Sequence, residues 1–183
     1  MAPDYYESDE SLYTTMKKGC TKKVFLINGL NWVIKIPLSG QDSCKQEEII
    51  FAKAQKEKLD KYFAGIYLYS ADFLEMKNVY IQRKYPCDED RTGDALKDYV
   101  RNKYSDLDFN TLENIDDFFE EEIAKLDRGE LIEAIWGERN KRLQDFLILN
   151  NIDDIHGLNI GYNEEDEPIL IDYEPNSSAW KGD

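Results

Sequence analysis

The strongest constraint on the fold is a pair of apolar runs on either side of the dipeptide Asn28-Gly29. Residues 23–27 and 32–37 are rich in β-branched and aromatic side chains, which favour extended strands. An Asn-Gly dipeptide fits the tight turns that join antiparallel strands, because both residues tolerate a positive φ angle. The sequence therefore predicts a β-hairpin over residues 23–37.

After Pro86 the apolar pattern changes from strands to helices. Before Pro86, the sequence predicts an amphipathic helix over residues 46–62 and strands over residues 63–69 and 79–85. Beyond Pro86 the pattern predicts helices over residues 94–104, 113–126 and 131–149, then a hairpin of residues 158–162 with 169–173. This order predicts an α+β protein in two lobes. The expected parts are a flexible acidic tail (1–15), a sheet with one helix (16–86) and a helical lobe with a terminal hairpin (87–183).

The charge balance argues against two classes of partner. The 183 residues include 23 basic and 38 acidic side chains, giving a net charge of −15 at pH 7. Nucleic acids and anionic membranes are bound through clustered Lys and Arg, so neither is an expected partner. No apolar run has the length of a bilayer-spanning helix, and the first residues lack the layout of a secretory signal. Cys20, Cys44 and Cys87 are widely spaced and odd in number, which favours a reducing cytoplasm over a disulfide framework.

Three oxygen-bearing side chains near the terminal hairpin are the best candidates for a metal site. If the hairpin turns at residues 164–167, Asn159 and Asp172 are equally far from the turn and face each other across the strands. Asp154 lies on the loop that enters the hairpin. Carboxylate and amide oxygens that converge in this way suit Mg²⁺ with a bound phosphate. Asp and Asn are also common in turns, so a purely structural role for the loop is the alternative.

The spacing of Asp154, Asn159 and Asp172, with an apolar strand before the last, resembles the catalytic region of protein-kinase-like phosphotransferases. The form Asp-Ile-His-x-x-Asn-Ile-Gly is more similar to small bacterial and phage kinase-like proteins than to eukaryotic kinases. The resemblance implies that Asp154 orients or deprotonates the phosphoryl acceptor, while Asn159 and Asp172 hold Mg²⁺. It also implies ATP as the cofactor, and a two-lobed kinase-like fold with a truncated, mainly helical C-terminal lobe.

Two residues of the first half match what this family requires. Lys35 ends the stretch Trp-Val-Ile-Lys, which is similar to the family's Val-Ala-Ile-Lys motif, so the resemblance implies that Lys35 contacts the phosphates. Glu47, with Glu48 in reserve, is the glutamate expected to position Lys35 from the next helix. The alternatives are an edge-strand lysine that keeps a sheet soluble, and glutamates that favour the positive end of a helix.

The glycine-rich loop that covers the nucleotide in this family is only partly matched. When Val24 is aligned with the valine that follows the loop, Gly19 is the one glycine retained. Gly19 and Val24 are therefore candidates for cofactor binding. Lys17 and Lys22 stand where the family has its other glycines, so a close backbone approach to phosphate is exchanged for charge.

These residues favour two functions of different classes. The first is an ATP- and Mg²⁺-dependent phosphotransferase with Lys35 and Asp154 as catalytic residues and a protein among the candidate acceptors. The second is a pseudokinase-like module that binds a nucleotide or a protein without catalysis. The net charge also suggests a third hypothesis, an acidic mimic of nucleic acid. His156, the only histidine, is expected to make a structural contact within its loop.

Overall fold

The structure is a computed structural model of the chain and describes residues 13–18, 21–38, 42–73 and 77–176. The chain divides into two compact units. Unit 1 comprises Met1–Tyr85 and Ile171–Pro175, and unit 2 comprises Pro86–Leu170 and Asn176–Asp183. A short segment near the C-terminal end of the chain therefore belongs to the same unit as the N-terminal half.

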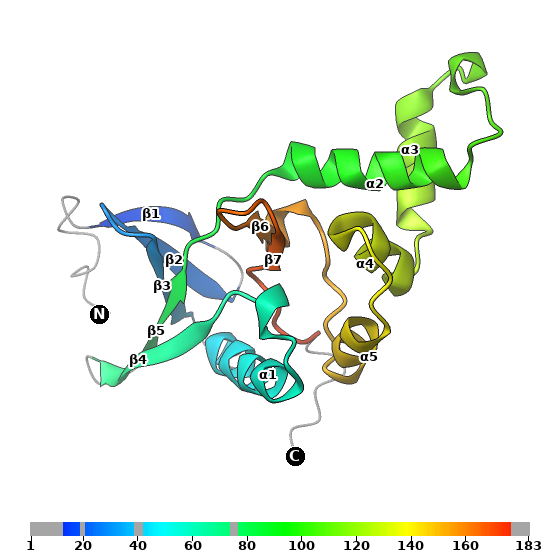
Figure 1. Ribbon diagram of the computed structural model, residues 1–183. Coiled ribbons are helices and arrows are strands. Elements are labelled where there is room, and N and C mark those ends of the chain that lie inside the picture. The colour runs from blue at the N-terminus through cyan, green and yellow to red at the C-terminus, as the bar shows by residue number, and fades with distance from the viewer. Residues whose placement is uncertain (1–12, 19–20, 39–41, 74–76, 177–183) are drawn as a thin grey trace. The chain divides into compact units, whose positions relative to one another are not determined.

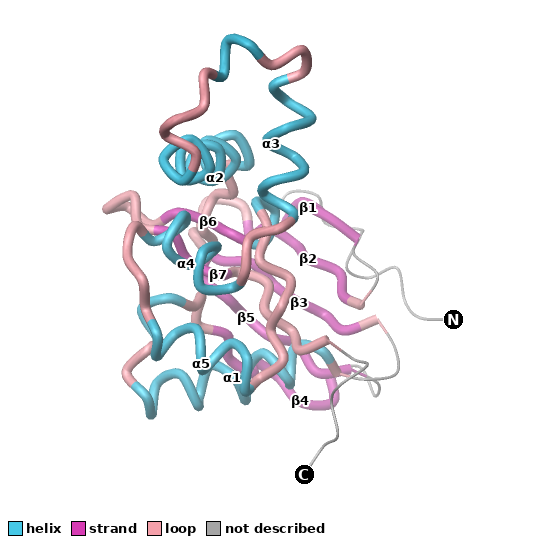
Figure 2. Tube along the Cα trace, turned by 90° about the vertical axis from the view of Figure 1, so that its right-hand side faces the viewer, coloured by secondary structure: helices cyan, strands magenta, loops and turns pink. Residues whose placement is uncertain are grey.

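Unit 1 is built on a five-stranded antiparallel sheet with the strand order β1-β2-β3-β5-β4 (Figure 2). The strands are β1 (Tyr13–Lys18), β2 (Lys22–Ile27), β3 (Trp32–Pro37), β4 (Ile66–Phe73) and β5 (Lys77–Arg83). β2 and β3 form the predicted hairpin, with Val24 opposite Lys35. In its turn Gly29 has a φ of 78°, and the Leu30 N–H donates to the Ile27 carbonyl at 3.1 Å. The hairpin prediction is confirmed.

The two faces of this sheet differ in character. Paired residues share a face and side chains alternate along a strand, so the register sets Lys22, Lys35 and Tyr80 on one face. These three side chains are buried although each carries a polar group. The opposite face carries an apolar cluster of Phe25, Ile36 and Val79, with Ile34 packed against it. One face of the sheet therefore carries buried polar and charged groups, and the other carries an apolar cluster.

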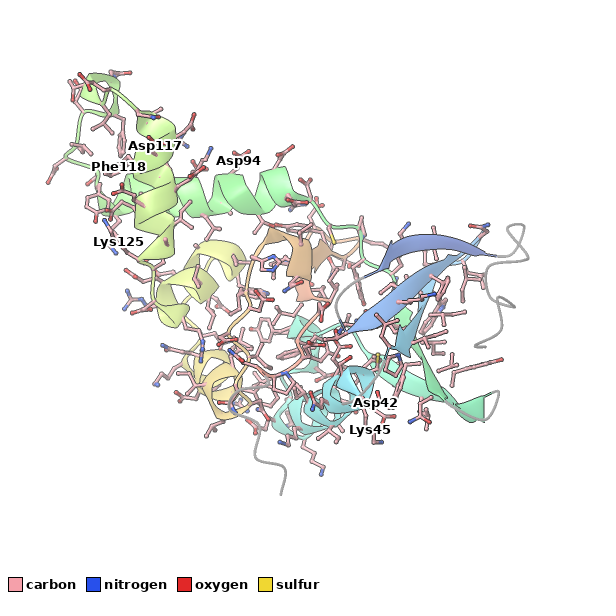
Figure 3. All side chains as sticks on the ribbon, turned by 180° about the vertical axis from the view of Figure 1, so that it is seen from behind. Asp42, Lys45, Asp94, Asp117, Phe118 and Lys125 are labelled. Carbon is pink, nitrogen blue, oxygen red and sulfur yellow. The ribbon has the colours of Figure 1, made fainter. Side chains whose placement is uncertain are left out.

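Helix α1 (Ser43–Glu57) packs against β3 and β4. It begins three residues before the predicted helix because Asp42 caps it, the carboxylate accepting from the Lys45 N–H at 2.9 Å. Figure 3 shows both residues at the start of α1. The same carboxylate accepts from the Tyr80 hydroxyl at 2.8 Å, so the cap also ties the helix to the polar face of the sheet.

α1 ends at Glu57, five residues before the predicted end, because Lys58 adopts a left-handed conformation with a φ of 57°. A separate 3₁₀ helix, η2 (Asp60–Tyr62), follows. Among the residues that the structure describes, α1 is the one α-helix between β3 and β4, where the sequence predicts a sheet with one helix. The predicted α+β class, with an antiparallel sheet followed by a mainly helical part, is confirmed.

Unit 2 is mainly helical. Its elements before the terminal hairpin are α2 (Glu89–Lys103), η3 (Phe109–Thr111), α3 (Ile115–Ala124), α4 (Arg128–Trp136), α5 (Lys141–Leu149) and η4 (Gly157–Asn159). The prediction of one helix over residues 131–149 is wrong. Gly137 ends α4 in the left-handed region with a φ of 74°, and Asn140 starts α5 by accepting from the Leu143 N–H at 3.0 Å.

α2 and α3 contact each other, and aromatic rings pack near their ends. The Phe118 ring, labelled on α3 in Figure 3, meets Tyr104 edge-on at 5.7 Å and Phe109 at 5.9 Å. Phe119 is 1% exposed. Glu120 and Glu121 are exposed, so the acidic run on this helix is its solvated face, as the sequence predicts.

The terminal hairpin pairs β6 (Ile160–Tyr162) with β7 (Pro168–Leu170), so both strands are shorter than predicted. Ile160 lies opposite Leu170, and an isolated bridge joins Gly161 to Cys87. The hairpin is therefore attached to the start of unit 2.

The register of this hairpin corrects one prediction about the site. Extending the pairing would set Asn159 opposite Ile171, so the predicted facing of Asn159 and Asp172 is wrong. The turn closes earlier than assumed because the Asn163 side-chain oxygen accepts from two N–H groups of the turn, at 3.0 and 2.8 Å, and Asp166 adopts a φ of 64°. Asp172 follows the end of β7 and belongs to unit 1.

Each unit has its own buried apolar core. In unit 1 the core includes Phe25, Val33, Ile50, Phe51, Phe63 and Ile66, and in unit 2 it includes Val100, Phe119, Ile132, Leu143, Phe146 and Ile160. None of the helices in the described ranges combines the length and the apolar composition that crossing a membrane requires.

Two glycines of unit 2 should respond oppositely to alanine. Gly137→Ala forces a side chain into the left-handed region, so we expect a loss of about 1 kcal/mol in the free energy of unfolding. Gly93→Ala, inside α2 with open space around the added Cβ, should gain up to about 1 kcal/mol. Urea unfolding of the full chain measures both changes. Equal effects would contradict the boundary between α4 and α5.

Candidate functional site

Lys35 lies in the middle of the sheet, because β3 pairs with β2 on one side and β5 on the other. Its side chain is 5% exposed, and its ammonium donates to Glu47 Oε2 at 3.0 Å and to the Ile171 carbonyl at 2.8 Å. The alternative of a solubilising edge-strand lysine is therefore wrong. A buried lysine that holds two acceptors is fixed in position by its surroundings.

Glu47 is the partner of Lys35, as the sequence predicts, and its side chain is fully buried. Its Oε1 atom accepts from Lys22 at 2.8 Å and from the Tyr173 N–H at 3.3 Å. Glu47 lies beyond the first turn of α1, so the alternative role at the helix terminus does not describe it. Glu48 instead pairs with Lys45 at 2.5 Å near the surface.

The sequence reasoning named Lys22 only as a charged replacement for a loop glycine and missed its place in the buried cluster. Its ammonium lies 2.8 Å from Glu47, 2.7 Å from Asp172 and 3.2 Å from Glu174, and its side chain is 5% exposed. The signal that could have found it is strand alternation, which sets Lys22 on the same face as Val24 and therefore as Lys35.

The segment Ile171–Pro175 supplies the rest of the site. Tyr173 is 1% exposed, its hydroxyl donates to the Ala64 carbonyl at 2.6 Å, and its ring meets Phe63 edge-on at 5.1 Å. The Thr21 hydroxyl donates to Glu174 at 3.0 Å. Both side-chain and backbone groups therefore bind this segment to the sheet.

Burial and charge act in opposite directions on the groups of this cluster. Burial alone would lower the pKa of Lys22, but the attraction of Glu47, Asp172 and Glu174 outweighs it and raises the pKa above its ordinary value. For Asp172 burial would raise the pKa, and the nearby Lys22 and Lys35 lower it instead. Lys22 and Asp172 are therefore both charged at neutral pH.

Cys44, at the start of α1, is fully buried. Burial, together with the nearby Glu47 carboxylate, raises the pKa of its thiol to about 12. The thiol is therefore protonated at neutral pH and is not a nucleophile of this site.

Asp154 and Asn159 lie in unit 2, on the loop before β6. The Asn159 amide donates to the Asp154 carbonyl at 2.9 Å and is buried, whereas the Asp154 side chain is 70% exposed. His156 Nδ1 accepts from the Leu158 N–H at 3.2 Å, and its Nε2 atom lies 3.1 Å from the Asp154 carboxylate and 3.2 Å from the Asn159 amide nitrogen. His156 thus makes the structural contact that the sequence predicts.

The site residues fall into two groups. Lys22 joins Glu47 to Asp172 in unit 1, and Lys35 is bound to the same Glu47. The half-buried Val24 lies opposite Lys35 on the same face. Gly19 lies outside the described residues. That Asp154 and Asn159 join the first group stays a prediction.

The residues of unit 1 do not fit a Mg²⁺ ion as they are arranged. Asp172, the expected metal ligand, holds the Lys22 ammonium at 2.7 Å. Within the described ranges, no group of three His, Cys, Asp or Glu side chains gathers in a way that could hold a metal ion. That Asn159 of unit 2 joins Asp172 of unit 1 in a magnesium site stays a prediction.

No protein-family model matches this chain, and no curated protein matches it either. Three solved structures are similar to this chain at low identity. The apo GRMZM2G135359 pseudokinase has a TM-score of 0.40 and 13% identity, over 90% of this chain and 58% of that one. PK-1, the Cydia pomonella granulovirus kinase, has a TM-score of 0.39 and 12% identity, over 93% and 54%. APH(2")-IIia in its GDP and kanamycin complex has a TM-score of 0.38 and 15% identity, over 92% and 71%.

This chain therefore spans little more than half the length of the first two of these proteins. Likeness at this level says nothing of what the chain binds. The features that indicate a function are the contacts within unit 1 and the loop before β6 in unit 2.

Glu47→Gln should destabilise the protein far more than the same change one residue later. It leaves Lys22 and Lys35 buried with one negative charge fewer, so we expect the free energy of unfolding to fall by about 3–5 kcal/mol. Glu48→Gln removes a pair at the surface and should cost about 1 kcal/mol or less. Urea unfolding measures both, and losses of equal size would argue against the buried ion cluster.

The Asp172 carboxylate should stabilise the fold except in acid. Its pKa is lowered from an ordinary value of 3.8, so its contribution is fully present above that value and is lost as the pH falls through the lower, folded-state value. The melting temperature of the wild type should exceed that of Asp172→Asn by a constant amount near neutral pH. This difference should become smaller below about pH 4. Thermal unfolding against pH measures it. A difference in melting temperature that increases in acid would contradict the lowered pKa of Asp172.

Proposed function

We propose that this protein is a protein-kinase-like phosphotransferase that uses ATP. The observation that carries the proposal is the buried ion pair between Lys35 and Glu47, at 3.0 Å. In kinase-like enzymes, a strand lysine held by a helix glutamate binds the phosphates of the nucleotide and must be in place for transfer. The pair joins β3 to α1, the elements that the family resemblance assigns to this role.

Lys35 is suited to binding phosphate because it is oriented and retains donor capacity. An ammonium group has three N–H donors. Among the described residues, Lys35 donates to Glu47 and to the Ile171 carbonyl, so one N–H is left for a phosphate oxygen. A lysine already fixed by its neighbours loses little side-chain entropy when the phosphate binds.

Asp154 is proposed to accept or orient the proton of the acceptor hydroxyl. Its carboxylate is exposed, and its backbone is held by the Asn159 amide at 2.9 Å. Nε2 of His156 lies 3.1 Å from the same carboxylate and limits its orientations. Catalysis by such a site consists mostly of positioning and charge neutralisation, so a fixed carboxylate within reach of the acceptor is what the reaction requires.

The resemblance assigns Mg²⁺ to Asn159 and Asp172. No step of the proposed reaction uses this ion. Asp172 is bound to Lys22, and this arrangement does not fit a metal ion. Lys22 and Lys35 are the cations that the chain itself supplies to unit 1.

A second candidate is favoured by the same contact. If Lys22 keeps Asp172 engaged, one requirement for transfer is unmet while the Lys35–Glu47 pair persists. The protein would then be a pseudokinase-like module that binds a nucleotide or a protein partner without catalysis. Nucleotide binding and phosphoryl transfer therefore have to be measured separately.

Phosphoryl transfer is tested with γ-labelled ATP, the full chain and a panel of protein and small-molecule acceptors. Asp154→Asn should lower the rate at least about 100-fold. Its ATP affinity should stay within about twofold, because the lost contact acts in the transition state. Asp153→Asn is the matched control, since its carboxylate accepts from Asn176 at 3.1 Å and has no catalytic role. Equal rates for both variants would remove Asp154 from the mechanism.

Calorimetry with ATP separates the two candidates. Lys35→Met should weaken binding by about 10- to 100-fold through loss of a charge-assisted hydrogen bond. Lys23→Met removes the same charge from the opposite face of β2 and should change the affinity less than about twofold. ATP binding without transfer to any acceptor supports the second candidate. If the wild type does not bind ATP, the phosphotransferase is wrong, and so is the nucleotide-binding form of the second candidate.

A further inference from the structure

Three carboxylates of unit 1 share one cation, and that cation is a side chain. The ammonium of Lys22 contacts Glu47 from α1, and Asp172 and Glu174 from the segment Ile171–Pro175. An ammonium has three N–H donors; two are hydrogen-bonded to Glu47 and Asp172, and Glu174 completes the cluster as an ion pair. Lys22 is 4% exposed, so solvent contributes little to its neutralisation.

The distances in this cluster fit an ammonium rather than a magnesium ion. The N–O distances to Glu47 and Asp172, 2.8 and 2.7 Å, are normal for charged hydrogen bonds, and Glu174 lies 3.2 Å away as an ion pair. Mg²⁺ requires oxygen ligands at about 2.0–2.1 Å in near-octahedral geometry. Each carboxylate would have to move inward and Lys22 would have to leave before a metal could bind there.

We propose that Lys22 is the resident cation of this carboxylate cluster and takes the place that a divalent metal ion would otherwise fill. Lys22 is covalently part of β2, so neither dilution nor a chelator removes it. The adjacent Thr21 binds Glu174 as well, so the start of β2 holds the acidic segment by two neighbouring side chains. In the native protein the cluster therefore needs no metal ion for its stability and does not bind one.

This inference goes beyond the proposed function and stands or falls separately, because none of its tests needs a nucleotide. It predicts a gain of metal binding when Lys22 is removed. As they are arranged, the three carboxylates do not form a metal site, but without Lys22 they are free to move inward onto a hard cation such as Mg²⁺ or Mn²⁺.

Mn²⁺ is the probe, and the bound ion is measured by electron paramagnetic resonance on the full chain. The wild type should bind no Mn²⁺ that depends on Asp172. Lys22→Ala should gain one ion per chain, and Lys22→Ala combined with Asp172→Asn should lose it again. Lys23→Ala removes the same charge on the other face of β2 and should gain none.

Two results of this experiment would overturn the proposal. The first is Mn²⁺ bound by the wild type and lost in Asp172→Asn, because the carboxylates would then accept a metal despite Lys22. The second is a Lys22→Ala variant that is folded by circular dichroism and binds no more Mn²⁺ than Lys23→Ala.

A measurement on the wild type covers the case in which Lys22→Ala does not fold. The melting temperature of the wild type should be unchanged between chelator and millimolar Mg²⁺, because a ligand that binds no site in the folded state does not stabilise it. Lys22→Arg, which keeps the charge, should behave in the same way. A rise in melting temperature with Mg²⁺ that disappears in Asp172→Asn would overturn the proposal.

Discussion

The buried carboxylate of Glu47 is the interaction on which unit 1 depends. A carboxylate without solvent costs several kcal/mol unless cations and hydrogen-bond donors surround it. Glu47 meets this requirement with Lys35 on one oxygen, and with Lys22 and the Tyr173 N–H on the other. These partners come from β3, β2 and the segment Ile171–Pro175, so one side chain on α1 connects three parts of the chain that are distant in sequence.

Two lysines around one glutamate would leave an excess of positive charge. The carboxylates of the segment Ile171–Pro175 neutralise it. Asp172 and Glu174 both approach Lys22 while Lys35 binds the Ile171 carbonyl. The polar face of the sheet therefore requires this segment, whereas the opposite face with Phe25, Ile36 and Val79 is stabilised by burial alone. A hydrophobic replacement could be equally stable, so the ionic arrangement is retained for specificity or for chemistry.

The sequence could predict the parts of this site that depend on local pattern. The local pattern predicts the strand that carries Lys35 and the helix that carries Glu47, and the family resemblance singles out these two residues. Lys22 could not be assigned a role, because its partners depend on where residues 171–175 return along the sheet. The break at Gly137 and the shifted register of the last hairpin were missed for a related reason. In each, one left-handed residue or one side-chain cap outweighs a longer apolar pattern.

The position of Asp172 along the chain limits what its carboxylate can do. The segment Ile171–Pro175 belongs to unit 1, yet β7 before it and Asn176 after it belong to unit 2, so the segment has short covalent links on both sides. A carboxylate that must hold Lys22 is not free to hold a metal ion, and releasing it would also detach Tyr173 and Glu174 from their partners. Metal binding by Asp172 would therefore be coupled to the loss of this segment from the sheet. A lysine in the cluster avoids that coupling, because it supplies the charge without requiring the segment to move.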